Sequence, residues 1–461
     1  ARFIEAVSFS QNNLGATPSI PSQQGSTPSR PLRDPFATPS QPLRTPAKAV
    51  MIRAGLLYDR KPGEWARMID SKAARIVGAV VEDRLRWDPA GKVWFIWRGH
   101  YWEPQADDGE ADALITAMVE LGTERLGYRP SYLNGIVNLM QRSGRVKNTP
   151  SIEGVIPFRN GLLCVETGRI EPATPDRALT WSLPHDYQAG AACPSIREWL
   201  LDAVGDSETV ELLRAWLAAL IRGVQLQRFL MLLGPGGSGK STFARLANAI
   251  AGKLNTTTST LRDLENNRFE VAKIYGRTLL NISEAGKHGG AVNMLKAITG
   301  GDELPLERKH QQQTGTFTYA GQTLLVSNED LITSDTTTGL ERRRVTVKFP
   351  KRVTAQERLD WQARGGEDAV LHTEIPGLIN WCLELSDRDI HERFEAIPKQ
   401  VTVDNLLGMA AGNSVADWLI EKCRPSKGFL QVGTKNEIRE NGETFYRDAD
   451  RHAYPSYLQF C

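Results

Sequence analysis

The sequence predicts an α/β fold built around one sheet, on three observations. From about residue 226 to 350, short apolar runs of β character alternate with helical stretches, the pattern of a sheet covered by helices. Residues 234–242 read GPGGSGKST, which matches the pattern GxxxxGK[ST]. An apolar run at 229–233 precedes this motif, and a helical pattern closed by Gly252 follows it. Strand, loop and helix therefore occur in the order that a phosphate-binding loop requires.

The composition is that of a water-soluble chain with more than one domain. With 461 residues, the chain exceeds the length at which one hydrophobic core usually keeps growing. Its 56 Lys and Arg nearly balance its 54 Asp and Glu, so any contact with nucleic acid must be local. The five cysteines form no CxxC pair, which argues against a disulfide framework and a zinc ribbon and favours a reducing cytoplasm. No apolar run could span a bilayer, so we expect no membrane partner.

Shifts in composition divide the chain into segments. A Ser-, Thr-, Pro- and Gln-rich start cannot bury enough surface to fold, and mixed helical and aromatic strand patterns follow it. Because the chain begins with Ala and ends in an unfinished helix, we expect a piece of a longer polypeptide. The expected segments are a disordered linker (1–50), an α+β domain (51–200), a helical connector (201–225), the sheet-containing core (226–350), a helical part (351–400) and a partial C-terminal domain (401–461).

Local signals predict individual elements ahead of the core. The stretch RWDPAGKVWFIWRGHYWEP predicts two aromatic strands around residues 98–100. Asn160-Gly161 predicts a tight turn between two further strands. Asp206 is a good N-cap and Gly223 a good C-cap, so we expect a helix between them.

The glycine-rich loop supplies the chemistry of a nucleotide site. Its glycines let backbone N–H groups turn toward phosphate oxygens, and the following helix adds its positive N-terminal dipole. Lys240 is expected to reach the β- and γ-phosphates of ATP, and Ser241 to bind Mg²⁺. The residues expected to bind the nucleotide are Gly234, Pro235, Gly236, Gly237, Ser238, Gly239, Lys240, Ser241 and Thr242.

Hydrolysis needs further groups that later segments of the core supply. The run GRTLLNISEAG ends a strand in Glu284, which we expect at a strand next to the loop as a catalytic and metal-binding carboxylate. Asn328 ends the run QTLLVSNED and could sense the γ-phosphate. Arg343 and Arg344 precede the next strand and could stabilise charge in the transition state. A surface Glu, a turn-forming Asn and solvated arginines remain the simpler alternatives.

A basic segment lies between Glu284 and Asn328 in the sequence. Residues 307–314 are polar and basic, and apolar residues flank them on both sides, which predicts a hairpin with a charged tip. Arg308, Lys309 and His310 at this tip offer contacts to phosphates, which would give salt-sensitive binding independent of sequence. A solvated hairpin tip without a ligand would have the same composition.

The order of these motifs resembles that of the superfamily 3 helicases, and within them the phage/plasmid primase-helicase family. The resemblance implies an AAA+ core that forms a ring, a hexamer, around single-stranded or forked DNA and moves 3′ to 5′. It also implies that Lys309 and His310 grip the DNA and that Arg344, rather than Arg343, completes the neighbouring subunit's ATP site. A C-terminal winged-helix-like region, a primase or polymerase domain ahead of this chain and a place in a bacterial host's cytoplasm are further implications. A single Glu284 after Ser283 departs from the paired acidic residues of many members.

Two other functions share part of this evidence. A P-loop ATPase that does not act on DNA, such as a protein remodeller or a partition factor, would carry the same loop. A replication-initiation scaffold could bind DNA and keep ATP only as a structural ligand. The basic hairpin tip distinguishes the helicase from the first, and turnover dependent on Glu284 distinguishes it from the second.

Overall fold

The structure is a computed structural model that describes most of the chain beyond residue 68. The described ranges are 69–89, 91–105, 108–122, 128–142, 154–177, 179–283, 289–307, 315–333, 338–410, 414–423, 431–435, 437–441, 443–447 and 449–461. The chain divides into two compact units, the first comprising residues 1–151 and 173–178 and the second residues 152–172 and 179–461. Within the described ranges, no helix has the length and apolar character needed to cross a bilayer.

The first unit packs three helices, α3 (Asp70–Val81), α4 (Gly109–Gly122) and α5 (Pro130–Arg142), with a three-stranded antiparallel sheet. The sheet consists of β1 (Leu85–Asp88), β2 (Val93–Trp97) and β3 (Trp102–Pro104). The sequence predicted only β2 and β3. The turn after β1, where Asp88 accepts a hydrogen bond from the Gly91 amide at 3.0 Å, lets β1 pair with β2. Trp94 and Trp102 are fully buried, so these aromatic residues serve the core of the unit.

A second small sheet groups with the other unit. Its strands are β4 (Val155–Phe158), β5 (Gly161–Cys164) and β6 (Ile170–Glu171), and the predicted turn at Asn160-Gly161 joins the first two. Ile156, Phe158 and Leu163 belong to the main core of the second unit. Residues 152–172 and 179–200 therefore group with the core, whereas the sequence predicts them in the preceding α+β domain (51–200).

The core of the second unit is a parallel sheet of five strands in the order β13-β7-β12-β9-β8. These strands are β7 (Phe229–Leu233), β8 (Thr256–Thr260), β9 (Leu279–Ser283), β12 (Gln322–Ser327) and β13 (Arg344–Lys348). The alternation of strands and helices in the sequence thus gives the mixed α/β fold that it predicted.

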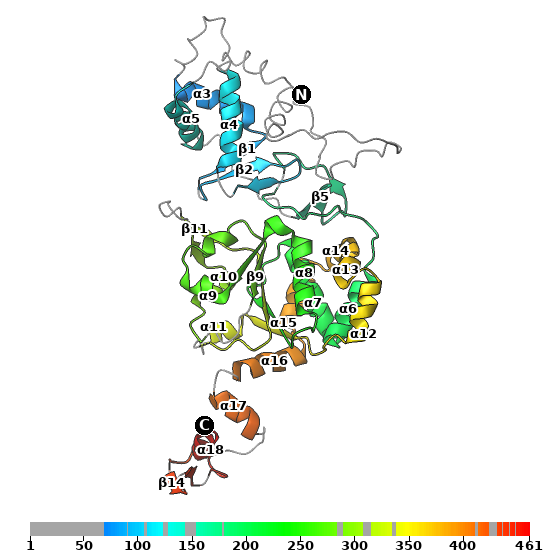
Figure 1. Ribbon diagram of the computed structural model, residues 1–461, viewed down its shortest axis with the longest axis vertical. Coiled ribbons are helices and arrows are strands. Elements are labelled where there is room, and N and C mark those ends of the chain that lie inside the picture. Colours follow the sequence, from blue (N-terminus) through cyan, green and yellow to red (C-terminus); the bar gives the residue numbers. More distant parts are fainter. Residues whose placement is uncertain are drawn as a thin grey trace, which may run out of the picture. The chain divides into compact units, whose positions relative to one another are not determined.

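Helices cover both faces of this sheet (Figure 1). Side chains alternate along β7: Leu230 and Leu232 join one core, and Phe229, Met231 and Leu233 the other. The first core packs against α6 (Pro194–Val204), α7 (Ser207–Arg222), α8 (Lys240–Ala251) and α14 (Ile375–Leu383). The second packs against α9 (Leu261–Asn266) and α10 (Asn293–Gly300). Burial on both faces explains why β7 is a continuous apolar run.

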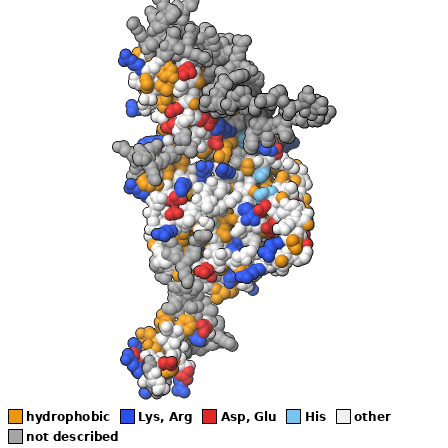
Figure 2. Space-filling view, in the orientation of Figure 1, with side chains coloured by type: hydrophobic (Ala, Val, Ile, Leu, Met, Phe, Trp, Pro, Cys, Tyr) orange, Lys and Arg blue, Asp and Glu red, His pale blue; other side chains and the backbone are white. Residues whose placement is uncertain are grey.

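The remaining elements extend or cover this core. Asn405 on α16 (Lys399–Ala410) accepts a hydrogen bond from the Thr346 amide at 2.7 Å, so this helix covers the open edge at β13. In Figure 2, cationic and anionic side chains are interspersed over the visible face, in keeping with the net charge of +2. The other elements are η2 (Lys253–Asn255), η3 (Val271–Ile274), β10 (Glu303–Pro305), β11 (Thr316–Thr318), α11 (Thr338–Glu341), α12 (Ala355–Ala363), α13 (Glu367–Thr373), α15 (Asp387–Glu395), α17 (Ser414–Lys422), β14 (Glu437–Glu440), β15 (Glu443–Tyr446) and α18 (Ala453–Phe460).

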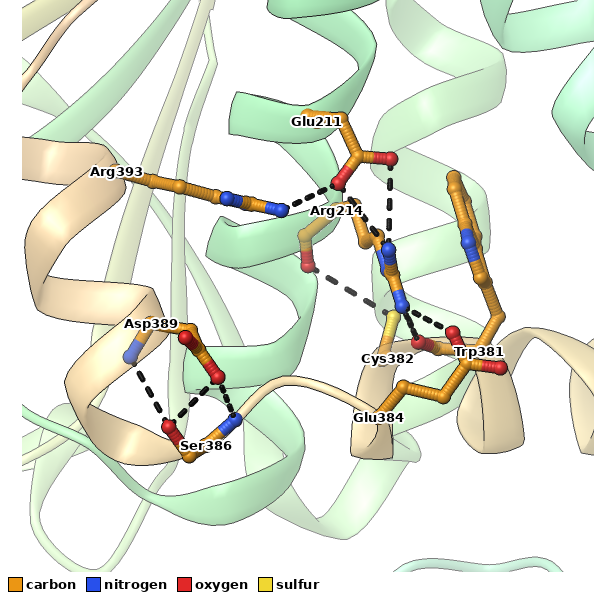
Figure 3. A network of polar contacts seen from close by, with 8 residues as sticks. All are labelled: Glu211, Arg214, Trp381, Cys382, Glu384, Ser386, Asp389 and Arg393. Carbon is orange, nitrogen blue, oxygen red and sulfur yellow. Dashed lines mark hydrogen bonds and ion pairs between the residues drawn. The ribbon is translucent and has the colours of Figure 1, made fainter.

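A buried arginine joins α7 to α14 (Figure 3). Asp206 and Gly223 cap α7 as the sequence predicted, and Arg214 on this helix is 7% exposed. The Arg214 guanidinium donates to the Trp381 carbonyl oxygen, with Nε at 3.0 Å, and pairs with Glu384 and Glu211. It also lies 4.7 Å from the centre of the Trp381 ring. One side chain thus satisfies a carbonyl group and joins α7 to α14.

Replacing Arg214 by Met should lower the free energy of unfolding by about 2 kcal/mol. The variant leaves the Trp381 carbonyl without its donor, whereas Glu384 is 67% exposed and regains water. Urea unfolding monitored by circular dichroism measures the change. Arg388→Met is the matched control, because the exposed Arg388 pairs only with Glu392 on its own helix, and its unfolding midpoint should not move. Equal midpoints for both variants would contradict this role of Arg214.

Candidate nucleotide-binding site

The glycine-rich loop that the sequence predicts to bind phosphate, called the phosphate loop below, connects β7 to α8 at the carboxyl edge of the sheet. Gly234 must be glycine because a Cβ there would lie 2.3 Å from the Phe349 carbonyl oxygen. Gly239 has a φ of 95° and precedes the first residue of α8. Gly239 at the N-cap has no side chain that could cap the amides that begin α8, so these N–H groups suit an anion. The local geometry therefore fits the phosphates of a nucleotide.

Lys240 lies inside the loop. Its ammonium donates to the carbonyl oxygens of Gly234 at 2.7 Å and Pro235 at 2.8 Å, and to the Ser238 hydroxyl at 3.3 Å. The side chain is 4% exposed, and burial lowers the pKa of Lys240 from its ordinary value. Among the described residues, only neutral oxygens accept hydrogen bonds from this ammonium, so a phosphate placed in the loop would supply a negative charge.

The two hydroxyl residues after Lys240 differ in their surroundings. Ser241 is exposed, which suits the predicted contact with Mg²⁺. Thr242 is 5% exposed, and its hydroxyl donates to the Glu367 carboxylate at 2.8 Å. Only the backbone of Thr242 therefore remains to contact a nucleotide, whereas its side chain joins α8 to α13.

Asn328 lies beside the loop. Ser327 pairs with Leu233 across the parallel strands β12 and β7, so Asn328 and Gly234 follow at the same level. Asn328 is exposed there. Ser283 ends β9 at the same edge, but β12 separates β9 from β7, so β9 is the second neighbour of the loop strand and not the adjacent one that we expected. Glu284 itself lies outside the described residues.

Arg343 and Arg344 lie at the amino ends of the strands, whereas the loop lies at the carboxyl ends. Arg344 pairs with Phe229, the first residue of β7, and the loop begins at Gly234, about 16 Å further along. Arg344 is 3% exposed, and its guanidinium binds Asp330 at 2.5 Å and Thr346 at 2.8 Å. Our preference for Arg344 as the residue that completes a neighbouring site is therefore corrected. Its donors are engaged within its own chain, where it joins β13 to the segment after β12.

Arg343 is the better placed of the two predicted arginines. It is partly exposed and donates to the Gly339 carbonyl oxygen at 2.8 Å. Its guanidinium also lies against the end of α10, because a Cβ at Gly300 would lie 2.7 Å from Nη2. Arg343 could thus meet a ligand on a neighbouring chain.

The predicted hairpin has paired strands at its base. β10 and β11 are antiparallel, with Leu304 opposite Phe317, and the Leu306 amide donates to the Gly315 carbonyl oxygen at 2.9 Å. The helix before it, α10, ends at Gly300 with a left-handed C-cap at Gly301. The tip residues Arg308, Lys309 and His310 lie outside the described residues.

A cavity of about 590 Å³ opens beside the phosphate loop. Ser238 and Gly239 of the loop line it, together with Trp199 and Leu201 on α6 and Trp361 on α12. Lys351 joins two of its walls, because its ammonium contacts Asp202 and Glu357, each at 2.6 Å. The cavity thus adjoins the loop and has apolar and charged walls.

Sequence reasoning missed two residues around the loop, Trp199 and Glu367. Glu367 lies 125 positions after Thr242 in the chain, and no motif contains it. Its place in the first turn of a helix is the only local signal, and acidic residues are common there. Trp199 reads as one more apolar position of an amphipathic helix.

Comparisons with known proteins find relatives for several parts of the chain. Residues 73–205 match the family described as D5 N terminal like, and residues 232–344 match a family of unknown function, DUF5906. The uncharacterized mitochondrial protein ymf21 of Marchantia polymorpha is 30% identical over 152 residues, which cover 30% of this chain and 84% of that protein. The uncharacterized mitochondrial protein ymf20 of the same organism is 28% identical over 114 residues, covering 25% of this chain and 68% of that protein.

Solved structures resemble the chain only distantly. The A form apo structure of the NrS-1 C terminal region has a TM-score of 0.47 and 14% sequence identity, covering 77% of this chain and 79% of that one. A second structure, of NrS-1 residues 305–718, has a TM-score of 0.44 and the same identity, covering 69% and 72%. Scores at this level do not establish a shared fold.

Proposed function

We propose that this chain, which belongs to the family of the uncharacterized mitochondrial protein ymf21 of Marchantia polymorpha, is an ATP-driven motor that acts on DNA. One observation carries the proposal: a phosphate loop lies at the carboxyl edge of the sheet, and a single helix, α10, leads from that edge to a hairpin. The match of residues 73–205 to the D5 N terminal like family supports a relative of the phage-type primase-helicases.

The proposed ATP site combines the groups at that edge. The α8 amides and Lys240 would hold the phosphates, Ser241 and Glu284 would hold Mg²⁺, and Asn328 would orient the attacking water. The exposed Ser241, the uncapped amides and the level of Asn328 beside Gly234 support this assignment. The five parallel strands, with the loop strand inside the sheet, support the AAA+ arrangement proposed for the core.

A path along the chain supports coupling between this site and the hairpin. β9 ends at Ser283, α10 begins at Asn293, and β10 begins at Glu303. Glu265 on α9 accepts hydrogen bonds from the Met294 and Leu295 amides, both at 3.0 Å, and so fixes the start of α10. A shift of the segment after β9 that reached α10 would therefore move α9, α10 and the base of the hairpin together.

The proposed motor works as a ring, a hexamer, in which Arg343 completes the site of the next subunit. The arginines lie at least about 16 Å from the loop of their own chain along the strands, which favours action on a neighbour. Sequential hydrolysis would then draw one DNA strand past Lys309 and His310, in the 3′ to 5′ direction that the helicase resemblance implies. The C-terminal elements from α17 to α18 would form part of a winged-helix-like DNA-binding region.

Replacing Lys309 by Ala should weaken binding of single-stranded DNA by about 10-fold at low salt, because a phosphate contact is lost. DNA stimulation of ATP hydrolysis should fall with it, while hydrolysis without DNA stays unchanged. Fluorescence anisotropy with labelled oligonucleotides and a phosphate-release assay measure both. Lys253→Ala removes the same charge from an exposed position in η2 and is the control. Unchanged DNA stimulation in the Lys309 variant would favour a P-loop ATPase that does not act on DNA.

A further inference from the structure

Resting on the proposed ATP site, we propose that Glu367 is a positioning residue that holds the phosphate loop in its binding geometry. Glu367 begins α13, far from the loop in the sequence. One carboxylate oxygen accepts a hydrogen bond from the Thr242 hydroxyl at 2.8 Å, and the other accepts from Trp199 Nε1, also at 2.8 Å. A single side chain therefore joins α6, α8 and α13 directly around the loop.

Both donors touch the phosphate loop itself. Thr242 lies in the first turn of α8, whose amides point toward the phosphate position. The Trp199 ring packs against Gly239, because a Cβ on this glycine would lie 3.4 Å from the ring. Trp199 and Thr242 are 6% and 5% exposed, so water does not replace a lost partner readily. The positions of Gly239 and Thr242 thus depend on Glu367.

The neighbouring residue Asp368 makes it possible to distinguish positioning of the loop by Glu367 from simple attachment of α13 to α8. Asp368 contacts α8 as well, through the Arg245 guanidinium at 2.7 Å. Arg245 also donates to the Thr242 hydroxyl at 3.1 Å, but Asp368 itself contacts neither Thr242 nor Trp199 in the interactions that the structure shows. Removing Asp368 therefore weakens the attachment of α13 and leaves both Glu367 hydrogen bonds in place.

The test compares nucleotide binding in Glu367→Ala, Glu367→Gln and Asp368→Ala. Calorimetry with ATP and with inorganic tripolyphosphate measures affinity, and steady-state hydrolysis separates KM from kcat. Glu367→Ala should bind both ligands about 10-fold more weakly, because the loop that holds the phosphates is disturbed. Glu367→Gln keeps an acceptor for Trp199 and an amide that can donate to the Thr242 oxygen, so it should stay within about 3-fold of wild type, as should Asp368→Ala.

Three outcomes decide the proposal. Tripolyphosphate binding of Glu367→Ala at the wild-type level would overturn it, and so would an equal loss in Asp368→Ala. If Glu367→Ala does not fold, Thr242→Val removes one of the two donors without changing the shape of the side chain and should weaken tripolyphosphate binding in its place; wild-type affinity there would also overturn the proposal. Failure of the ATP site itself differs from all of these, because wild type would then bind no tripolyphosphate or Lys240→Ala would bind it equally well.

Discussion

Lys240→Ala should reduce ATP hydrolysis by about 100-fold or more, because it removes the cation that the loop directs at the β- and γ-phosphates. The fold should survive the change. Among the described residues, the Lys240 ammonium donates to two carbonyl oxygens and the hydroxyl of Ser238, all within the loop, and the apolar core on either side of β7 does not depend on it. A phosphate-release assay at saturating ATP measures the loss.

Lys253→Ala is again the charge-matched control, and it should hydrolyse ATP like wild type. Circular dichroism of both variants should match that of wild type. Hydrolysis by Lys240→Ala within about 3-fold of wild type would mean that the loop does not bind the reacting phosphates, and the proposed site would fail with it.

Arg343→Ala should lower hydrolysis by about 1,000-fold in the assembled protein while ATP binding is retained, as expected for an arginine that acts only in the transition state. The prediction follows from its partial exposure and its distance from the loop of its own chain. Arg342→Ala is the matched control, because Arg342 is the adjacent and more exposed arginine. Arg344→Ala should instead destabilise the fold, since it leaves Asp330 without its buried partner.

Mixing two inactive variants tests the action of Arg343 on a neighbour. Lys240→Ala supplies an intact Arg343, and Arg343→Ala supplies an intact phosphate loop. In a mixed assembly, a site is complete where the intact loop of an Arg343→Ala subunit faces the intact Arg343 of a neighbouring Lys240→Ala subunit. Part of the ATP hydrolysis should therefore return when the two variants are mixed. A mixture that stays inactive despite proven exchange of subunits would place the catalytic arginine elsewhere.

Local patterns predicted the parts of the molecule that depend on near neighbours in the sequence. The loop motif between β7 and α8, the Asp206 and Gly223 caps of α7, and the strand pair β10–β11 are of this kind. Each is determined by backbone requirements within a few residues, such as the close approach at Gly234. The alternation of strands and helices predicted an α/β sheet for the same reason.

Contacts between distant segments escaped prediction. Arg344 ends a run of three arginines, which suggested that its guanidinium could reach the ATP site of a neighbouring subunit. The chain between β12 and β13 instead brings Asp330 against Arg344, and the arginine side chain is buried. Glu367 acts on the loop only because α13 packs on α8. The order of the strands, with β12 between β7 and β9, is likewise a property of the whole sheet. Periodicity reports which face of an element is buried, but not which partner buries it.

Unwinding of forked DNA tests the central claim most directly. Wild type and Lys240→Ala are compared at equal concentration, with ATP and Mg²⁺, on a fork whose displaced strand carries a fluorophore. An ATP-driven motor predicts strand release by wild type and none by the variant. No release by wild type, together with a monomeric mass in solution, would contradict a ring-forming motor, and equal release by both proteins would contradict a motor driven by this loop.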